Sequence, residues 1–299
     1  MQRDEFGRNE LNDSPELGID HLTMLGVSPP DLVSVTREAG FDLVGLRVVP
    51  AAPGEEPWPM TADAPMLEET ACRLDDTGVR VLSVEVVRVG PGTKREDYEQ
   101  ALEAGARLRA RYVTVNVDDP DIERACEAFA ALTADARPYG LRPLIEPIPY
   151  TQVSNLDEAI YIAKRSGGGG ILLDALHFQR YGGRLERLRS VDRDLLSYVQ
   201  LCDAPLAPPS EVPHPSSLPR GQSTDGTDLQ LESRAMRLLP GEGELPLRKF
   251  LAALPAGIPV SVEAPILSLQ ETLTPVEFAR RAREAVANVI PERDLNPGD

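Results

Sequence analysis

Short apolar runs alternate with amphipathic stretches along most of the chain. The apolar runs end near residues 25, 48, 87, 117, 147, 175, 202 and 264, about 30 residues apart except across residues 204–243. The stretches between them carry apolar positions at helical spacing, open at residues such as Pro29 and Asn155, and close before glycines such as Gly40 and Gly78. Pro and Asn are typical of helix starts, and Gly is typical of helix ends. The pattern therefore predicts alternating strands and helices.

The number and spacing of the strands indicate the architecture. We expect strands over residues 18–26, 41–49, 79–87, 111–117, 141–147, 171–175, 198–203 and 258–264. Eight strands with helices between them predict a closed (β/α)8 TIM barrel. The alternative is an open doubly wound sheet, but the chain has neither a GxGxxG motif after the first strand nor a P-loop. We therefore predict an α/β fold with a single barrel domain over residues 17–290.

Three segments fall outside the regular alternation. Residues 1–16 are polar and are expected to form a flexible tail, and residues 291–299 are expected to form a C-terminal tail. Residues 204–243, which follow the seventh strand, are rich in Pro, Ser and Gly. This stretch is too long for an ordinary loop of a barrel, so we expect a lid or an insertion loop.

The composition excludes several classes of protein. Of the 299 residues, 41% are hydrophobic and 26% are charged, which is typical of a globular protein with a sizeable core. A formal net charge of −17 opposes binding to nucleic acid. No apolar run is long enough to span a membrane, no apolar signal segment stands at the N-terminus, and the three cysteines are widely spaced. We expect a cytoplasmic protein that binds a small molecule; a homo-oligomer is left open.

Acidic residues end three of the apolar runs. Glu146 follows PLI, Asp174 follows ILL, and Glu263 follows VSV, while Gln200 and Asp203 lie in YVQLCD. The carboxyl ends of barrel strands meet at one mouth, where TIM-barrel enzymes place their reacting groups. Like charges about 4 Å apart cost on the order of 4 kcal/mol at an effective dielectric near 20. Either some of these acids are protonated or a cation such as Mg²⁺ or Mn²⁺ lies among them. Asp203 is equally well explained as a loop acid.

Four further residues are candidates for contact with a substrate. His21 and Arg47 lie in the expected first and second strands. Each either faces the barrel interior and binds substrate or has a structural role, His21 in the core and Arg47 at the surface. Glu85 interrupts the apolar run VLSVEVV, which favours a polar role inside the barrel. Trp58 is the only tryptophan and lies in a Pro-rich loop. It either forms a wall or lid over a substrate or simply packs against the protein. Apart from Arg47 and Arg180 no basic cluster is evident at the mouth, so an unphosphorylated substrate is preferred.

The chain also resembles a known family, the sugar phosphate isomerase/epimerase superfamily of xylose-isomerase-like TIM barrels. The resemblance extends from Gly18 to Ile290 and is carried by the order and spacing of six pieces: HLTMLGVSPPDLVSVTREAGFDLVGLR, LIEP, LLDALH, YVQLCDAP, PGEGELPLRKFL and VSVEAP. It implies a metal held by Glu146, Asp174, a ligand of the seventh strand and Glu263. It also implies that Glu146 and Glu263 act as an acid/base pair and that His177 binds a substrate oxygen.

The seventh strand departs from the family pattern. The family usually has His there, and this chain has Gln200. An amide oxygen is an uncharged and weaker ligand, although it suits a hard cation such as Mn²⁺ or Mg²⁺. The resemblance implies a metal-dependent isomerase or epimerase that acts on a small polyhydroxy ketone or aldehyde, a sugar or cyclitol, through an enediolate. A dehydratase or lyase acting on a keto-sugar or keto-cyclitol, and a non-catalytic barrel subunit with a lapsed metal site, are the alternatives.

Overall fold

Eight parallel strands close into a single barrel. The computed structural model describes residues 14–51, 54–210 and 214–290. Within these residues each strand pairs with the next in sequence order and β8 pairs with β1, which confirms the predicted TIM barrel. The strands are β1 (Leu17–Ile19), β2 (Leu43–Arg47), β3 (Arg80–Val89), β4 (Tyr112–Val117), β5 (Arg142–Ile145), β6 (Gly170–Asp174), β7 (Leu196–Leu201) and β8 (Val260–Val262).

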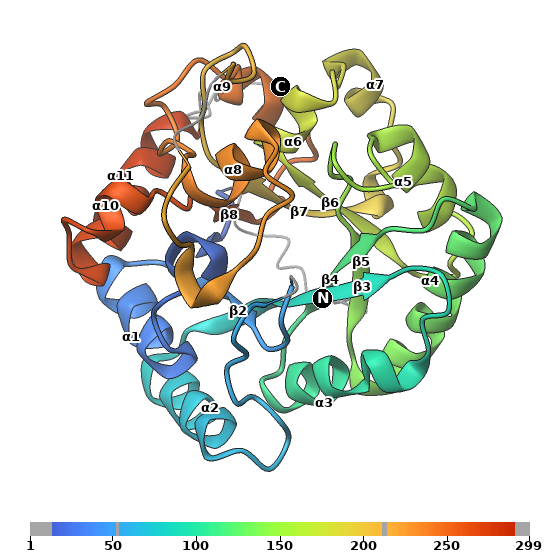
Figure 1. Ribbon diagram of the computed structural model, residues 1–299, viewed down its shortest axis with the longest axis horizontal. Helices are drawn as coiled ribbons and strands as arrows, with labels where there is room; N and C mark the ends of the chain where they lie inside the picture. The colour runs from blue at the N-terminus through green and yellow to red at the C-terminus, as the bar shows by residue number, and fades with distance from the viewer. Residues whose placement is uncertain (1–13, 52–53, 211–213, 291–299) are drawn as a thin grey trace, which may run out of the picture.

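Helices form an outer ring around the strands (Figure 1). Gly40 shows how a helix ends: its φ of +81° lets the chain leave α1 in the left-handed conformation that glycine tolerates. None of the helices in the described ranges is long and apolar enough to cross a membrane. They are α1 (Pro29–Ala39), α2 (Pro65–Thr77), α3 (Glu99–Arg107), α4 (Ile122–Ala136), α5 (Leu156–Ala163), α6 (Ala175–Arg180), α7 (Leu185–Arg189), α8 (Asp228–Ala235), α9 (Leu247–Leu251), α10 (Leu267–Gln270) and α11 (Pro275–Val289).

Two separate sets of apolar side chains fill the fold. The larger set packs the strands against the surrounding helices. The smaller set takes one residue from each of β2 to β7 and fills the barrel interior; it consists of Leu43, Leu82, Tyr112, Leu144, Leu172 and Tyr198. The Tyr112 and Tyr198 rings stack with centroids 5.6 Å apart. The interior is therefore packed, and polar groups gather toward the carboxyl ends of the strands.

The first strand is shorter than the sequence predicts. β1 ends at Ile19, and His21–Met24 form a 3-10 helix instead of continuing the strand expected over residues 18–26. Thr23 and Met24 are buried in this turn. The pattern that predicted a strand here therefore comes from side chains that pack in a tight turn. The change places Asp20 at the carboxyl end of β1.

The predicted tail and loop boundaries also need adjustment. Residues 1–13 and 291–299 lie outside the described residues, but Glu16 belongs to the barrel, because it pairs with Arg80 and Arg111 and its carbonyl accepts the N–H of Val260. Residues 204–243 include α8, which lies inside the ring of outer helices in Figure 1. Asp203, just before this segment, accepts three backbone N–H groups and so acts as a structural loop acid.

Candidate active site

The four residues implied as metal ligands lie at the carboxyl ends of consecutive strands. Glu146 and Glu263 directly follow β5 and β8, Asp174 ends β6, and Gln200 is the penultimate residue of β7. Asp174 is paired in register with Gln200, which in turn is paired with Ser261 of β8. Glu146, Asp174, Gln200 and Glu263 are all buried. The register therefore brings these polar groups to the same level of the barrel.

A buried arginine neutralises two of these acids. Arg237 Nη1 donates to Asp174 Oδ2 at 2.6 Å, and its Nη2 lies 3.0 Å from Glu263 Oε2. The guanidinium also donates to the backbone carbonyls of Ser233 and Glu263. Burial alone would raise the pKa of Asp174, but Arg237 and then His177 lower it, so that this pKa lies below its usual value. The chain thus supplies a counter-charge of its own at the barrel mouth.

Glu146 lies in a different environment. Its Oε2 accepts a hydrogen bond from Asn116 Nδ2 at 3.1 Å, and its Oε1 lies 3.8 Å from His177 Nε2. Burial, and then the charges of Glu263 and Asp174, raise the pKa of Glu146 well above its usual value. Burial lowers the pKa of His177 to about 4, so its ring is neutral near pH 7. The Glu146 carboxyl group and the neutral imidazole of His177 therefore lie side by side.

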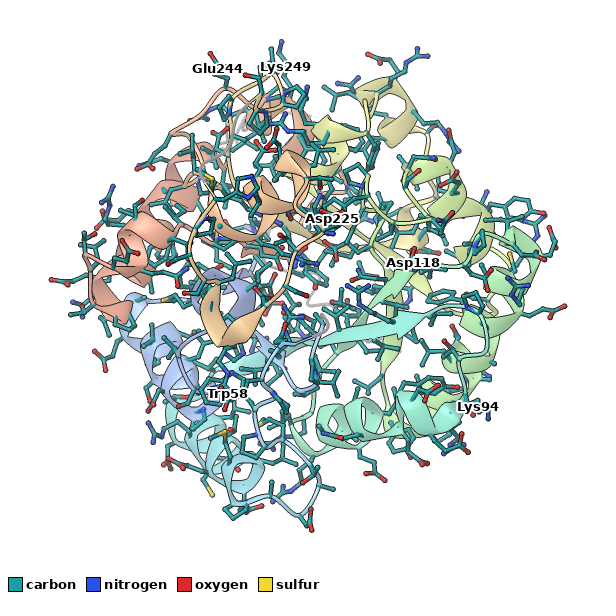
Figure 2. All side chains as sticks on the ribbon, in the orientation of Figure 1. Trp58, Lys94, Asp118, Asp225, Glu244 and Lys249 are labelled. Carbon is teal, nitrogen blue, oxygen red and sulfur yellow. The ribbon has the colours of Figure 1, made fainter. Side chains whose placement is uncertain are left out.

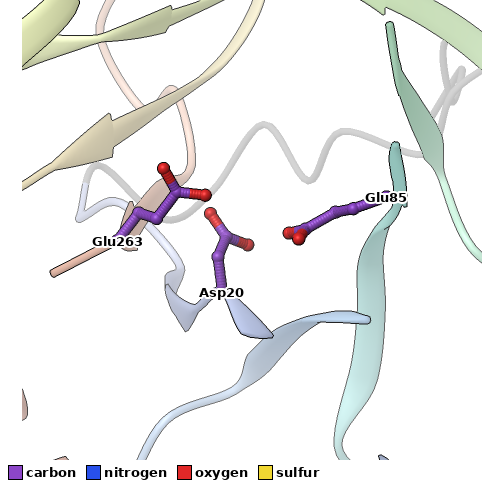
Figure 3. Close-up of side chains that lie close together, drawn as sticks. All are labelled: Asp20, Glu85 and Glu263. Atoms are coloured by element: carbon purple, nitrogen blue, oxygen red, sulfur yellow. The ribbon is translucent and has the colours of Figure 1, made fainter. Parts of the chain in front are cut away.

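A second acidic cluster shares Glu263 with the first group. Asp20, Glu85 and Glu263 each offer a carboxylate oxygen within 4.8 Å of the others, and they point toward one another (Figure 3). Gln200 Nε2 donates to Asp20 Oδ2 at 2.8 Å and to Glu263 Oε1 at 3.0 Å. Burial, and then the repulsion of neighbouring carboxylates, raises the pKa of Asp20 and of Glu85. Glu263 belongs both to this cluster and to the group around Arg237.

The oxygens of these residues fit a divalent cation. Asp20 Oδ1, both carboxylate oxygens of Glu85, and Gln200 Oε1 are buried without a hydrogen-bond partner in the described part of the chain. Such oxygens are costly unless a proton or a cation satisfies them. The donors are all carboxylate or amide oxygens, which are the ligands of hard cations. The buried acids could therefore hold a metal ion at the barrel mouth.

A cavity of about 130 Å³ opens above these groups. Of the residues that the sequence analysis singled out, Glu146, Glu263, His177 and Arg47 line it. Asp174, Gln200 and Glu85 do not line the cavity but support or adjoin residues that do. The cavity therefore has the two predicted acid/base residues in its wall.

Two of the predicted substrate-binding residues serve the structure instead. His21 is fully buried, its Nδ1 accepts the N–H of Arg47, and its Nε2 contacts the carbonyl of Val27 at 2.8 Å. Both ring nitrogens therefore have a partner, and His21 is not among the residues that line the cavity. Trp58 does not line the cavity either; it stacks on His21, and the Arg220 guanidinium lies 3.7 Å from the centroid of the Trp58 ring. Trp58 thus joins the loop after β2 to residues 204–243.

Several residues of the site were missed by the sequence analysis. Asp20 ends a strand as Glu146 and Glu263 do, but it was hidden because the first strand was expected to run through it. Arg88 is a charge inside the apolar run of β3, the same signal that singled out Glu85. Arg234 lies in α8 and Arg237 just after it. The sequence around them shows no clear strand or helix periodicity. No sequence signal marked these last two.

The barrel and its site define the class of protein. A closed eight-stranded barrel with acids, arginines and a cavity at the carboxyl ends of its strands has the layout of TIM-barrel enzymes. The family model described as a xylose isomerase-like TIM barrel matches residues 33–286, and the chain belongs to this family. The resemblance seen in the sequence is thereby confirmed.

Solved structures share the fold at low sequence identity. The IolI protein with a bound zinc atom has a TM-score of 0.69 and 20% identity, over 92% of this chain and 98% of that chain. A xylose isomerase-like TIM barrel/4-hydroxyphenylpyruvate dioxygenase fusion protein has a TM-score of 0.70 and 18% identity, over 92% of this chain but 43% of the fusion. D-allulose 3-epimerase from Methylomonas sp. has a TM-score of 0.64 and 15% identity, over 92% and 98%. No curated protein matches the chain.

Proposed function

We propose that this protein is an isomerase or epimerase that moves a proton on a small polyhydroxylated ketone or aldehyde, a sugar or a cyclitol. The observation that carries the proposal is the pair Glu146 and Glu263, two buried carboxyl groups in the wall of one cavity with different partners. Two carboxyl groups kept in different environments are suited to act as acid and base. The sugar epimerases among proteins of the same fold support this choice.

The partners of the two glutamates suggest their roles. Burial raises the pKa of Glu263, but the contact with Arg237 opposes this shift and favours the ionised form, so Glu263 is the proposed base that removes the proton next to the carbonyl group. Glu146 accepts from Asn116 and has a raised pKa, mainly because of burial, so it is the proposed acid that returns a proton. The neutral His177 lies in the same wall and is placed to bind a substrate oxygen.

We further propose that the protein uses Mg²⁺ or Mn²⁺, held by Glu146, Asp174, Gln200 and Glu263. Such an ion would polarise the substrate carbonyl and stabilise the negative charge that develops on it. The orphaned buried oxygen of Gln200 supports a cation in this region, and the IolI protein, which has the same fold, binds a zinc atom. Arg237 would then hold Asp174 Oδ2 and Glu263 Oε2 and favour the ionised form of both carboxylates.

Proton exchange with solvent tests the proposal. Ketoses, aldoses and keto-cyclitols are incubated in deuterated water with protein loaded with Mn²⁺, and the hydrogen next to the carbonyl group is followed by NMR. One of them is expected to take up deuterium with no other change in mass. Glu146→Gln and Glu263→Gln should each slow the exchange by about 10²- to 10⁴-fold, whereas Glu186→Gln, at an exposed position of α7, should not.

Two other outcomes would replace the proposal. Loss of water or of another leaving group from the substrate would identify a dehydratase or lyase that uses the same base. Absence of exchange with every compound, while the metal is bound in stoichiometric amount, would contradict catalysis of this kind and favour a non-catalytic barrel.

A further inference from the structure

Four arginines line the cavity: Arg47, Arg88, Arg234 and Arg237. Arg237 is neutralised by Asp174 and Glu263. The other three come from the ends of β2 and β3 and from α8, so they approach the cavity from three different segments. This concentration of positive charge stands in a chain whose net charge is −17.

Arg47 is buried with unused donors. Its side chain is 5% exposed, and the nearest carboxylate oxygens, of Glu55 and Glu85, lie 3.6 and 3.9 Å away, beyond hydrogen-bond distance. Its Nε and Nη1 have no hydrogen-bond partner in the described part of the chain. A buried guanidinium without hydrogen bonds is costly, and an oxyanion in the cavity would satisfy these donors.

Arg88 and Arg234 are held in place by backbone rather than by acids. Arg88 Nε donates to the carbonyl of Ala51 at 2.5 Å, and Arg234 Nη1 donates to the carbonyl of Ser223. Neither guanidinium has a carboxylate within 4.0 Å among residues 14–51, 54–210 and 214–290. Burial and then the charge of Arg234 lower the pKa of Arg88; Asp118 and Tyr150 oppose this shift, and the charge of Arg47 adds to it. The three cations therefore face the same space and repel one another.

Nearby acids offset this charge only in part, because Glu55 and Glu85 lie 3.6 and 3.9 Å from Arg47 and Asp118 acts on Arg88. Glu263 is paired with Arg237, and Glu146 with Asn116 and His177. Asp118 is exposed, and its Oδ1 accepts the N–H of Gln152. The labelled Lys94 and Lys249 lie at the outer edge of the molecule, far from the labelled Asp118 near its centre (Figure 2). The cavity therefore holds a local group of arginines, while other basic side chains, such as Lys94, Lys249 and Arg187, lie at the surface.

We propose that Arg47, Arg88 and Arg234 form a subsite for an oxyanion, so that the substrate is an anionic polyhydroxylated ketone or aldehyde. A carboxylate and a phosphate share the chemistry that this subsite recognises, because guanidinium groups donate paired hydrogen bonds to both. The preference for an unphosphorylated substrate rested on finding no basic cluster beyond Arg47 and Arg180 in the sequence, and Arg180 pairs with Glu232. The choice of substrate class rests on the proposed function, but the anion subsite itself does not.

Binding of simple probes tests the subsite. D-glucuronate, D-glucose 6-phosphate and neutral D-glucose are titrated into the full chain by calorimetry at fixed ionic strength. One of the two anionic sugars is expected to bind at least about tenfold more tightly than glucose, because a lost charge-assisted hydrogen bond weakens binding by about tenfold or more. The better of glucuronate and glucose 6-phosphate identifies the anion as a carboxylate or a phosphate.

Matched variants locate the binding. Arg88→Gln and Arg234→Gln should each weaken binding of the anionic sugar about tenfold, and leave the binding of glucose unchanged. Arg187→Gln, which removes an exposed arginine of α7 paired with Asp157, should bind like the parent protein. Melting temperatures measured without ligand show that each variant is folded. Equal binding of all three sugars, no binding of either anion, or unchanged anion binding by Arg88→Gln and Arg234→Gln would each overturn the proposal.

The subsite and the proposed function fail separately. Exchange of a proton on a neutral sugar, with no binding of the anionic probes, would refute the subsite alone. Arginine-dependent binding of an anionic sugar, with no proton exchange on any compound, would refute the isomerase or epimerase function alone.

Discussion

The Arg237 guanidinium lies 2.6 Å from Asp174 Oδ2, and both side chains are almost completely buried. The same guanidinium contacts Glu263 at 3.0 Å, so one cation from the segment after α8 ties the ends of β6 and β8 together. Removing one partner of a buried ion pair leaves an uncompensated charge, which costs far more than the loss of an exposed pair.

Arg237→Met is therefore expected to lower the free energy of unfolding by about 3–5 kcal/mol. The measurement is urea unfolding of metal-free protein near pH 7. Arg187→Gln removes an exposed pair with Asp157 and should cost less than about 1 kcal/mol. Equal effects of the two substitutions would show that Arg237 does not stabilise the buried acids.

Metal content distinguishes the two acidic groups that share Glu263. If Mn²⁺ or Mg²⁺ is held by Glu146, Asp174, Gln200 and Glu263, Glu146→Gln should lose the ion and Asp20→Asn should retain it. Mass spectrometry of protein dialysed against Mn²⁺ and then against buffer gives the answer. The reverse pattern would place the ion in the cluster of Asp20, Glu85 and Glu263. A parent protein that binds no Mn²⁺ would contradict both sites.

His177 makes stability depend on pH in the acidic range. Burial lowers its pKa from 6.5 to about 4 in the folded chain, so the unfolded chain binds more protons between these values. The stabilising contribution of neutral His177 is complete above pH 6.5 and is lost as pH falls to about 4. Each pH unit in this window should cost about 1.4 kcal/mol.

The comparison with His177→Asn isolates this effect from the other acids and bases. Unfolding free energies measured from pH 7 to pH 4 should fall less steeply in His177→Asn than in the parent protein. His214→Asn, at an exposed position of the segment after β7, serves as the control. Parallel curves for the parent protein and His177→Asn would contradict a neutral buried His177.

Arg220 and Trp58 form one of the contacts between the loop after β2 and residues 204–243, together with hydrogen bonds from Arg220 to the carbonyls of Glu56 and Pro57. The guanidinium lies 3.7 Å from the ring centroid, and a cation–π contact of this kind is worth about 0.5–2 kcal/mol. Arg220→Ala should shift the fluorescence of Trp58, the only tryptophan, to longer wavelength and speed proteolysis within residues 204–243. Arg165→Ala, which removes a similar stack on Tyr161, should change neither. Unchanged emission in Arg220→Ala would show that the contact does not hold this segment.

The barrel and the positions of the main acids follow from local patterns in the sequence. Apolar runs about 30 residues apart predict eight strands, and acids that directly follow such runs, as Glu146 and Glu263 do, are brought to one mouth by the parallel arrangement alone. The same rule applied to β1 would have found Asp20, but the buried turn at His21–Met24 imitates a longer strand. Periodicity reports burial, and burial does not distinguish a tight turn from a strand end.

The charge balance of the site was decided by tertiary structure. Arg237 and Arg234 belong to a segment without clear periodicity, and they reach the cavity only because α8 packs over the barrel. His21 seemed a candidate ligand until both ring nitrogens were found in use. The positions of the strands can be predicted because each strand is a local apolar run and the runs recur at a regular interval along the chain. Which arginine meets which carboxylate depends on side chains from segments more than 60 residues apart, such as Arg237 and Asp174, and electrostatic energy depends on that distance in space rather than on the order of residues along the chain.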